Sequence, residues 1–156
     1  MKRAFACLVG WAALAVFAVG SALGGPAWAD AVLDRADLLM NAFSWRESYE
    51  YLVPFERERA GQYDYDFRLG RSAFNAEMYE RAGKIFERMV ANDPKDALAH
   101  FDLGRAYFIL GDYRGAKAHL EAAKAMLSGS DMLIEMTLFY AENRLKQQNA
   151  RSQEGR

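Results

Sequence analysis

Apolar residues recur at helical spacing along most of the chain, in stretches separated by short turns. One turn is explicit at Gly111-Asp112, within "LGDY", where glycine and aspartate are typical of the end of one helix and the start of the next. Pro94 closes another stretch because proline cannot continue a helix. Asp131 is suited to cap a further helix that runs to about Gln148. The pattern predicts an all-α protein made of short paired helices.

The pairs follow an internal repeat. The segments 63–96 and 97–130 align without a gap, and a weaker copy fits at about 30–62. A hairpin of this length cannot bury its own apolar face, so about three stacked units and a terminal cap are needed for stability. The identical positions in the two stronger copies are Phe67/Phe101, Leu69/Leu103, Gly70/Gly104, Arg71/Arg105, Phe74/Phe108, Tyr79/Tyr113, Ala82/Ala116, Glu87/Glu121 and Ala91/Ala125.

On these positions the chain resembles the tetratricopeptide repeat family. The match consists of the Leu-Gly pair, the aromatic residue of the turn, the small residue that follows it and the closing Pro94, although the third unit has Ser128 in place of that proline. The resemblance covers about residues 30–130. It implies an all-α, right-handed α-solenoid of about three hairpins, at about 30–62, 63–96 and 97–130. We expect a C-terminal capping helix at 131–148 and a disordered polar tail at 149–156.

The N-terminus has the pattern of a secretory signal peptide. Lys2 and Arg3 precede an uncharged apolar run, and the small residues Ala27 and Ala29 precede Asp30. We therefore expect a signal peptide at 1–29, cleavage after Ala29 and export, most simply to the periplasm. The alternative is an uncleaved membrane anchor. The single cysteine lies within this leader, so the mature 30–156 chain is expected to be held together by packing without disulfides.

The recurring Phe-Leu-Gly-Arg-x-x-Phe motif supplies the candidate binding site. Its Phe, Arg and second Phe are spaced i, i+4 and i+7, so they share one helix face. In tetratricopeptide proteins the corresponding places line a concave groove, and arginine and aromatic residues are enriched in binding hot spots. The alternative is ordinary packing between repeats. The candidate peptide- or protein-binding residues are Phe67, Arg71, Phe74, Asn75, Phe101, Arg105, Phe108 and Ile109, with Leu33, Asp37, Met40 and Leu98 at neighbouring places.

Little in the sequence indicates catalysis or a cofactor. His100 and His119 lack the partner ligands of a zinc site, so we expect neither a metal nor another cofactor. Asp64 and Asp66 are read as carboxylates that favour a helix N-terminus, and the charged stretch 56–66 is read as a solvated helix end with a loop. The net charge of −1 gives no indication of nucleic-acid binding.

These observations predict a non-catalytic adaptor of the bacterial cell envelope that holds a peptide or protein segment in its groove. Replacing Arg71 and Arg105 together with alanine is expected to weaken partner capture and to leave melting nearly unchanged. Three alternatives stay open. The first is a membrane-tethered assembly factor for a secretion or surface-polymer system. The second is an envelope enzyme with an unrecognised site, or the regulatory subunit of such an enzyme. The third is a solenoid that assembles with copies of itself.

Overall fold

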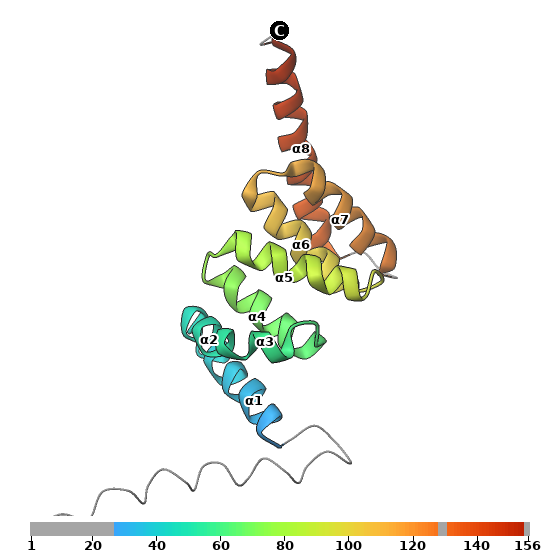
Figure 1. The fold of residues 1–156 in the computed structure, drawn as a ribbon. Coiled ribbons are helices and arrows are strands. Elements are labelled where there is room, and N and C mark those ends of the chain that lie inside the picture. The colour runs from blue at the N-terminus through green and yellow to red at the C-terminus, as the bar shows by residue number, and fades with distance from the viewer. Residues whose placement is uncertain (1–26, 128–130, 155–156) are drawn as a thin grey trace, which may run out of the picture.

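The computed structural model of the chain describes residues 27–127 and 131–154, and their backbone is helical apart from short connections. The expected all-α solenoid of about three hairpins and a further helix is confirmed (Figure 1). Most of the predicted leader, residues 1–26, lies outside the described residues. The elements are α1 Ala27–Asn41, α2 Trp45–Leu52, the 3-10 turn η1 Val53–Phe55, α3 Glu56–Arg59, α4 Tyr63–Asn75, α5 Tyr79–Asn92, α6 Ala97–Leu110, α7 Tyr113–Met126 and α8 Met132–Glu154.

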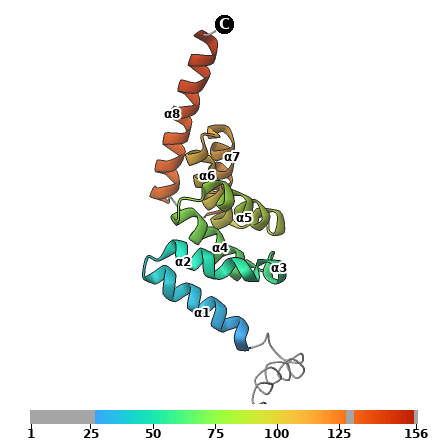
Figure 2. The same cartoon turned by 60° about the vertical axis from the view of Figure 1, so that its left-hand side comes forward.

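The helices pair as hairpins, α1 with α2, α4 with α5, and α6 with α7. The hairpins follow one another along one direction, and α8 lies against the last of them (Figures 1 and 2). The second helix of each hairpin contacts the first helix of the next element. In addition, α1 contacts α4, α4 contacts α6, and α6 contacts α8. The helices α1, α4, α6 and α8 therefore form a continuous row, which we call the first-helix row.

The turn inside each hairpin is built in the same way. Phe43, Glu77 and Gly111 stand 34 residues apart and have positive φ angles of 58°, 65° and 83°. In each case the amide of the following residue donates a backbone hydrogen bond to the carbonyl five residues earlier, over 2.9 to 3.0 Å. Glycine adopts this left-handed conformation without cost, whereas phenylalanine and glutamate do not. The shared turn shows that the first unit, whose sequence matches the repeat only weakly, is a hairpin of the same kind.

The small residues of the repeat allow the two helices of a hairpin to approach closely. A Cβ added at Gly70 would lie 2.6 Å from the ring of Phe86, and one at Gly104 would lie 2.7 Å from Leu120. Phe86 and Leu120 are themselves buried and fill the space between neighbouring helices. Each bulky side chain thus occupies the volume that glycine leaves free on the facing helix.

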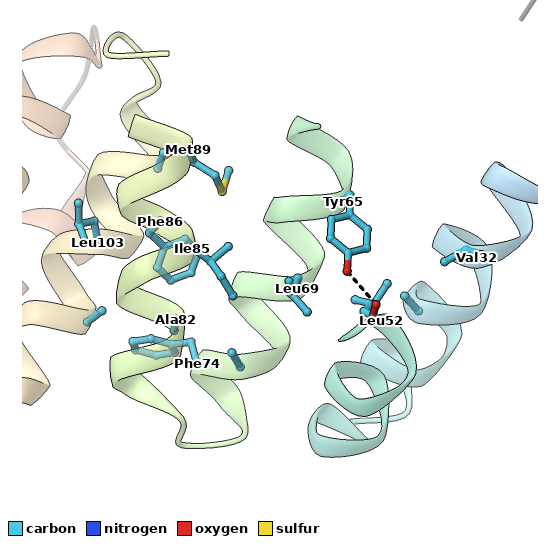
Figure 3. Close-up of a cluster of buried hydrophobic side chains, with 14 residues drawn as sticks. Val32, Leu52, Tyr65, Leu69, Phe74, Ala82, Ile85, Phe86, Met89 and Leu103 are labelled. Atoms are coloured by element: carbon cyan, nitrogen blue, oxygen red, sulfur yellow. Dashed lines mark hydrogen bonds between the residues drawn. The ribbon is translucent and has the colours of Figure 1, made fainter. Parts of the chain in front are cut away.

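Buried polar bonds connect one hairpin to the next. The Tyr65 hydroxyl donates a 2.7 Å hydrogen bond to the carbonyl of Leu52, at the end of α2 (Figure 3). Nearby, the hydroxyls of Ser48 and Ser72 are 2.8 Å apart and fully buried. These bonds satisfy polar groups that would otherwise be costly to bury, and they fix how α4 sits on α2.

The charged stretch 56–66 is not the solvated helix end that the sequence predicted. Asp66 is fully buried and accepts hydrogen bonds from the amide of Gly61 and from Arg88, whose guanidinium contacts both carboxylate oxygens at 2.6 and 2.9 Å. Glu56 pairs with Arg88 at 3.1 Å and also with Arg81. The partners lie far downstream on α5, so local charge patterning gave no sign of them. This ionic cluster joins α3, α4 and α5.

The last helix is longer than expected. Asp131 caps it as predicted, with its carboxylate accepting hydrogen bonds from the amides of Leu133 and Ile134. However, α8 continues to Glu154, so the disordered tail expected for 149–156 is wrong over 149–154. The stretch has no large apolar residue, but a helix already fixed by its packed first half extends at little cost through Ala, Arg, Gln and Glu. In Figures 1 and 2 this end projects beyond the hairpins.

Candidate functional site

The candidate site lies where α4 and α6 run side by side in the first-helix row. Both helices carry the Phe-Leu-Gly-Arg-x-x-Phe motif, and the 34-residue repeat places equivalent side chains on corresponding turns of the two helices. Each leucine and glycine of the motif is buried. The phenylalanines and the arginine of each motif lie on the side of the helix next to the buried Leu-Gly side. The two motifs therefore lie next to each other, as the sequence predicted.

Arg105 occupies the junction between the two helices. Its guanidinium carbon lies 4.4 Å from the ring centroid of Phe74 on α4 and 5.4 Å from that of Phe101 on α6. It also pairs with Asp102 across 3.1 Å. Phe74 and Phe101 are only 8% and 9% exposed, so they support Arg105 and offer little surface to a partner. Arg105 is therefore a packing residue, and the expected neutral effect of its removal on melting no longer follows.

Arg71 is placed differently, although it occupies the equivalent position of its repeat. Its guanidinium carbon lies 5.2 Å from the ring centroid of Phe67, and Phe67 stacks in turn on Tyr63 with centroids 6.0 Å apart. Within residues 27–127 and 131–154, the Arg71 guanidinium forms no ion pair or hydrogen bond. The side chain is half-buried, held in position by an aromatic surface and still able to donate.

A buried carboxylate shapes the electrostatics around both arginines. Burial raises the pKa of Asp102, while the positive charges of Arg105 and Arg71 act in the opposite direction. The buried Asp102 carboxylate therefore offsets part of the positive charge of Arg105 and Arg71. The sequence analysis did not single out Asp102, because an acidic residue beside Phe101 looks like any solvated helix position until the burial of that side is known.

Exposed residues surround this centre. Leu98 and Ile109, near the two ends of α6, are exposed and share a side of the helix with Arg105. Phe108 is half-buried, with its ring centroid 5.7 Å from that of Tyr113. Asn75 is exposed at the end of α4, and its side-chain amide donates to the carbonyl of Arg71 over 2.8 Å. On this surface the Arg71 guanidinium is available to a partner, and Leu98 and Ile109 offer exposed apolar side chains.

The first unit contributes a bound charge pair. Asp37 on α1 accepts two 2.8 Å hydrogen bonds from Arg68 on α4, and these hydrogen bonds raise the pKa of Arg68. Asp37 is therefore already occupied, which the sequence analysis did not foresee. Arg68 follows the motif phenylalanine directly, and no local pattern links it to a residue 31 positions upstream. Leu33 is half-buried and packs against the core instead of standing free.

The two histidines contact each other away from this centre. Their Nδ1 atoms are 3.0 Å apart between α6 and α7, and His100 Nε2 lies 3.2 Å from the carbonyl oxygen of Pro94. Burial lowers the pKa of His119, and the proximity of His100 lowers it further. Among the described residues, no group of three or more His, Cys, Asp or Glu side chains is placed to hold a metal ion. None of the helices in the described ranges is both long and apolar enough to cross a membrane.

Comparison with known proteins agrees with the repeat and the fold. Residues 73–129 match the tetratricopeptide repeat family. Curated protein sequences gave no significant match. Among solved structures, the tetratricopeptide domain of Sgt2 from Aspergillus fumigatus is similar, with a TM-score of 0.71, 19% identity, and coverage of 81% of this chain and 85% of that one.

Two bacterial structures also share the fold. PcrH, a Pseudomonas aeruginosa protein, solved with the chaperone binding region of PopD, has a TM-score of 0.62 and 18% identity, covering 84% of this chain and 99% of that one. The translocator chaperone SycD from Yersinia enterocolitica has a TM-score of 0.61 and 11% identity, covering 80% and 85%. The family match covers residues 73–129, and the helical hairpin that precedes this segment, α1 with α2, has the same arrangement.

Proposed function

We propose that the chain is a non-catalytic interaction module of the bacterial cell envelope. In this proposal a peptide or protein segment lies across α4 and α6 of the first-helix row. Arg71 binds a carboxylate or backbone carbonyl of that segment. The side chains of Leu98 and Ile109 contact its apolar residues. The observation that carries the proposal is the Arg71 guanidinium, which is positioned by Phe67 and has no ionic partner in the described part of the chain.

An arginine held on an aromatic ring has already lost part of its side-chain freedom, so a ligand pays less entropy to order it. The planar fork of donors matches a carboxylate or a pair of carbonyl oxygens. Neighbouring apolar surface then adds binding energy without needing a fixed geometry. This combination suits a peptide better than a small polar ligand.

The comparisons support an interaction role at a coarser level. Members of the same fold include PcrH in complex with the chaperone binding regions of PopD and PopB. The N-terminal pattern supports export, since Lys2 and Arg3 precede an apolar run that ends in small residues before Asp30. Cleavage after Ala29 would fall inside the first turn of α1, which begins at Ala27. A mature protein whose mass begins at Asp30 supports the exported form, and one that retains Met1 favours the tethered alternative.

The direct test is affinity capture from the native envelope with three baits: the unaltered protein, Arg71→Ala and Arg114→Ala. Arg114 is exposed on α7, a second helix, and serves as the charge-matched control. We expect Arg71→Ala to lose the captured protein by about 10-fold or more, as for an arginine hot spot. Its melting temperature should stay within about 2 °C, because surface substitutions change stability by about 0.5 kcal/mol at most. Equal capture by all three baits contradicts the site.

A further inference from the structure

The helix α8 is apolar on two opposite sides. Ile134 and Ala141 are buried against α6 and α7, and Leu138 packs with them. Successive residues of a helix are about 100° apart. On that basis Met132, Met136 and Phe139 lie on the side that faces away from the hairpins. Their side chains are 80%, 48% and 60% exposed.

The uncovered side is confined to one half of the helix. Leu133 and Tyr140 flank it and are also about half exposed, which makes five large apolar side chains within nine residues. From Glu142 onward the exposed residues are polar or charged, apart from the small residue Ala150. Contiguous apolar patches on a helix rarely stay in water in a soluble protein, and they mark contact surfaces. The patch lies on the half of α8 that runs beside the last hairpin, and the polar half is the part that projects beyond it (Figure 2).

We propose that a second copy of this chain covers this face, with the two α8 helices packed antiparallel. A two-fold axis between Met136 and Phe139 places Met136 of one copy against Phe139 of the other. The same register places Met132 against Asn143 of the second copy. The apolar halves then cover each other, and both polar ends point outward into solvent. A two-fold interface of this kind uses the same patch on both copies.

The separation of like charges favours this orientation. In the antiparallel register the basic end of each α8, from Arg144 onward, lies beyond the start of the other copy's helix. A parallel arrangement would instead bring like residues together, including Arg144, Lys146 and Arg151 of both copies. Like charges at close range oppose association. The distribution of charge along α8 therefore selects the antiparallel pair.

The area is sufficient for a weak dimer. Five half-exposed large side chains offer on the order of 100 Å² each, so two copies bury about 1,000 Å² in total, at the lower end of specific interfaces. We therefore expect a dimer that forms reversibly as the protein concentration rises.

The test is sedimentation velocity over a range of concentrations with the purified protein and three variants. The protein should dimerise below about 100 µM, as a small specific interface allows. Met136→Lys should be monomeric at the same concentration, with unchanged helicity because Met136 is already exposed. Gln147→Lys, on the polar half of the same helix, is the matched control and should dimerise normally. Asn143→Leu should dimerise at several-fold lower concentration, because it faces Met132 of the second copy.

Two results would overturn the proposal. One is a protein that stays monomeric throughout, and the other is self-association that Met136→Lys leaves unchanged, since that would place the contact elsewhere on the chain. The register is tested by cross-linking in a Cys7→Ser background. A mixture of Met136→Cys and Phe139→Cys proteins should form the mixed disulfide faster than either protein pairs with itself. Preferential Met136→Cys self-pairing would contradict the antiparallel arrangement.

Discussion

Three glycine-to-alanine substitutions test the packing of the hairpins, because the same chemical change should have opposite effects at different sites. Gly70 and Gly104 lie in the close contacts of two hairpins. Gly83 is also helical and buried, but the nearest side-chain atom to an added Cβ there is 4.0 Å away, on Leu110. That distance is an ordinary van der Waals contact.

Two opposing contributions to the free energy of unfolding set the size of the expected effects. Alanine in a helix interior is favoured over glycine by about 0.5–1 kcal/mol. At Gly70 the new methyl group would lie 2.6 Å from the Phe86 ring, and at Gly104 it would also lie 3.3 Å from the backbone oxygen of Ala116. Overpacking of a buried site costs about 1–3 kcal/mol. We therefore expect Gly70→Ala and Gly104→Ala to lose about 1–2 kcal/mol each, and Gly83→Ala to gain up to about 1 kcal/mol.

Urea denaturation followed by circular dichroism measures these differences directly. Thermal melting gives a second reading, with shifts of about 4 °C per kcal/mol for a domain of this size. If all three variants gain stability, the close approach at Gly70 and Gly104 is absent in solution. If Gly83→Ala loses as much as the other two, the losses do not arise from these contacts and the packing account is wrong.

Four further substitutions test other parts of the structure. Glu77→Gly should stabilise the protein by up to about 1 kcal/mol and Gly111→Ala should destabilise it by a similar amount, because both positions have positive φ; equal signs in urea denaturation would contradict the shared turn. Asp66→Ala should cost about 3 kcal/mol in the same assay, since it leaves Arg88 without its buried partner, and a loss below about 0.5 kcal/mol would show that the cluster is dispensable. The pKa of His119 is lowered in the folded chain, so the unfolded chain binds more protons once the pH falls below about 6.5. The free energy of unfolding should therefore be fully retained at pH 7.5 and decline toward pH 5.5, and His119→Gln should flatten this dependence; an unchanged slope would refute the assignment.

The repeat carried most of the information about the fold. Small and bulky residues at fixed places predicted the hairpins, and Gly111 predicted one of the turns. Glu77 and Phe43 adopt the same conformation without glycine, so their turns are set by the packing of the flanking helices and not by local preference. The extent of α8 was underestimated because apolar periodicity reports packing, whereas a helix extends past its last packed turn.

The sequence placed the candidate residues on α4 and α6, but it did not distinguish the roles of the individual residues. The spacing of the motif placed Arg71 and Arg105 on equivalent turns, and the sequence alone does not distinguish their environments. Their environments differ because Phe74 lies against Arg105 from the preceding repeat and Asp102 is buried beside it. Both features depend on which residues of neighbouring helices meet. The pairs Asp37–Arg68 and Asp66–Arg88 were missed for the same reason, since each joins residues far apart in the chain.

Site-specific photo-cross-linking in the native envelope tests the proposed binding surface most directly. A photoreactive phenylalanine analogue at Leu98, which is exposed on the side of α6 that carries Arg105, is compared with the same probe at Lys84, exposed on α5. Binding across the first-helix row predicts a discrete cross-linked partner from position 98, its loss when Arg71→Ala is added, and no such product from position 84. A partner that cross-links from position 84 but not from 98, or a product at 98 that Arg71→Ala leaves intact, would contradict the account.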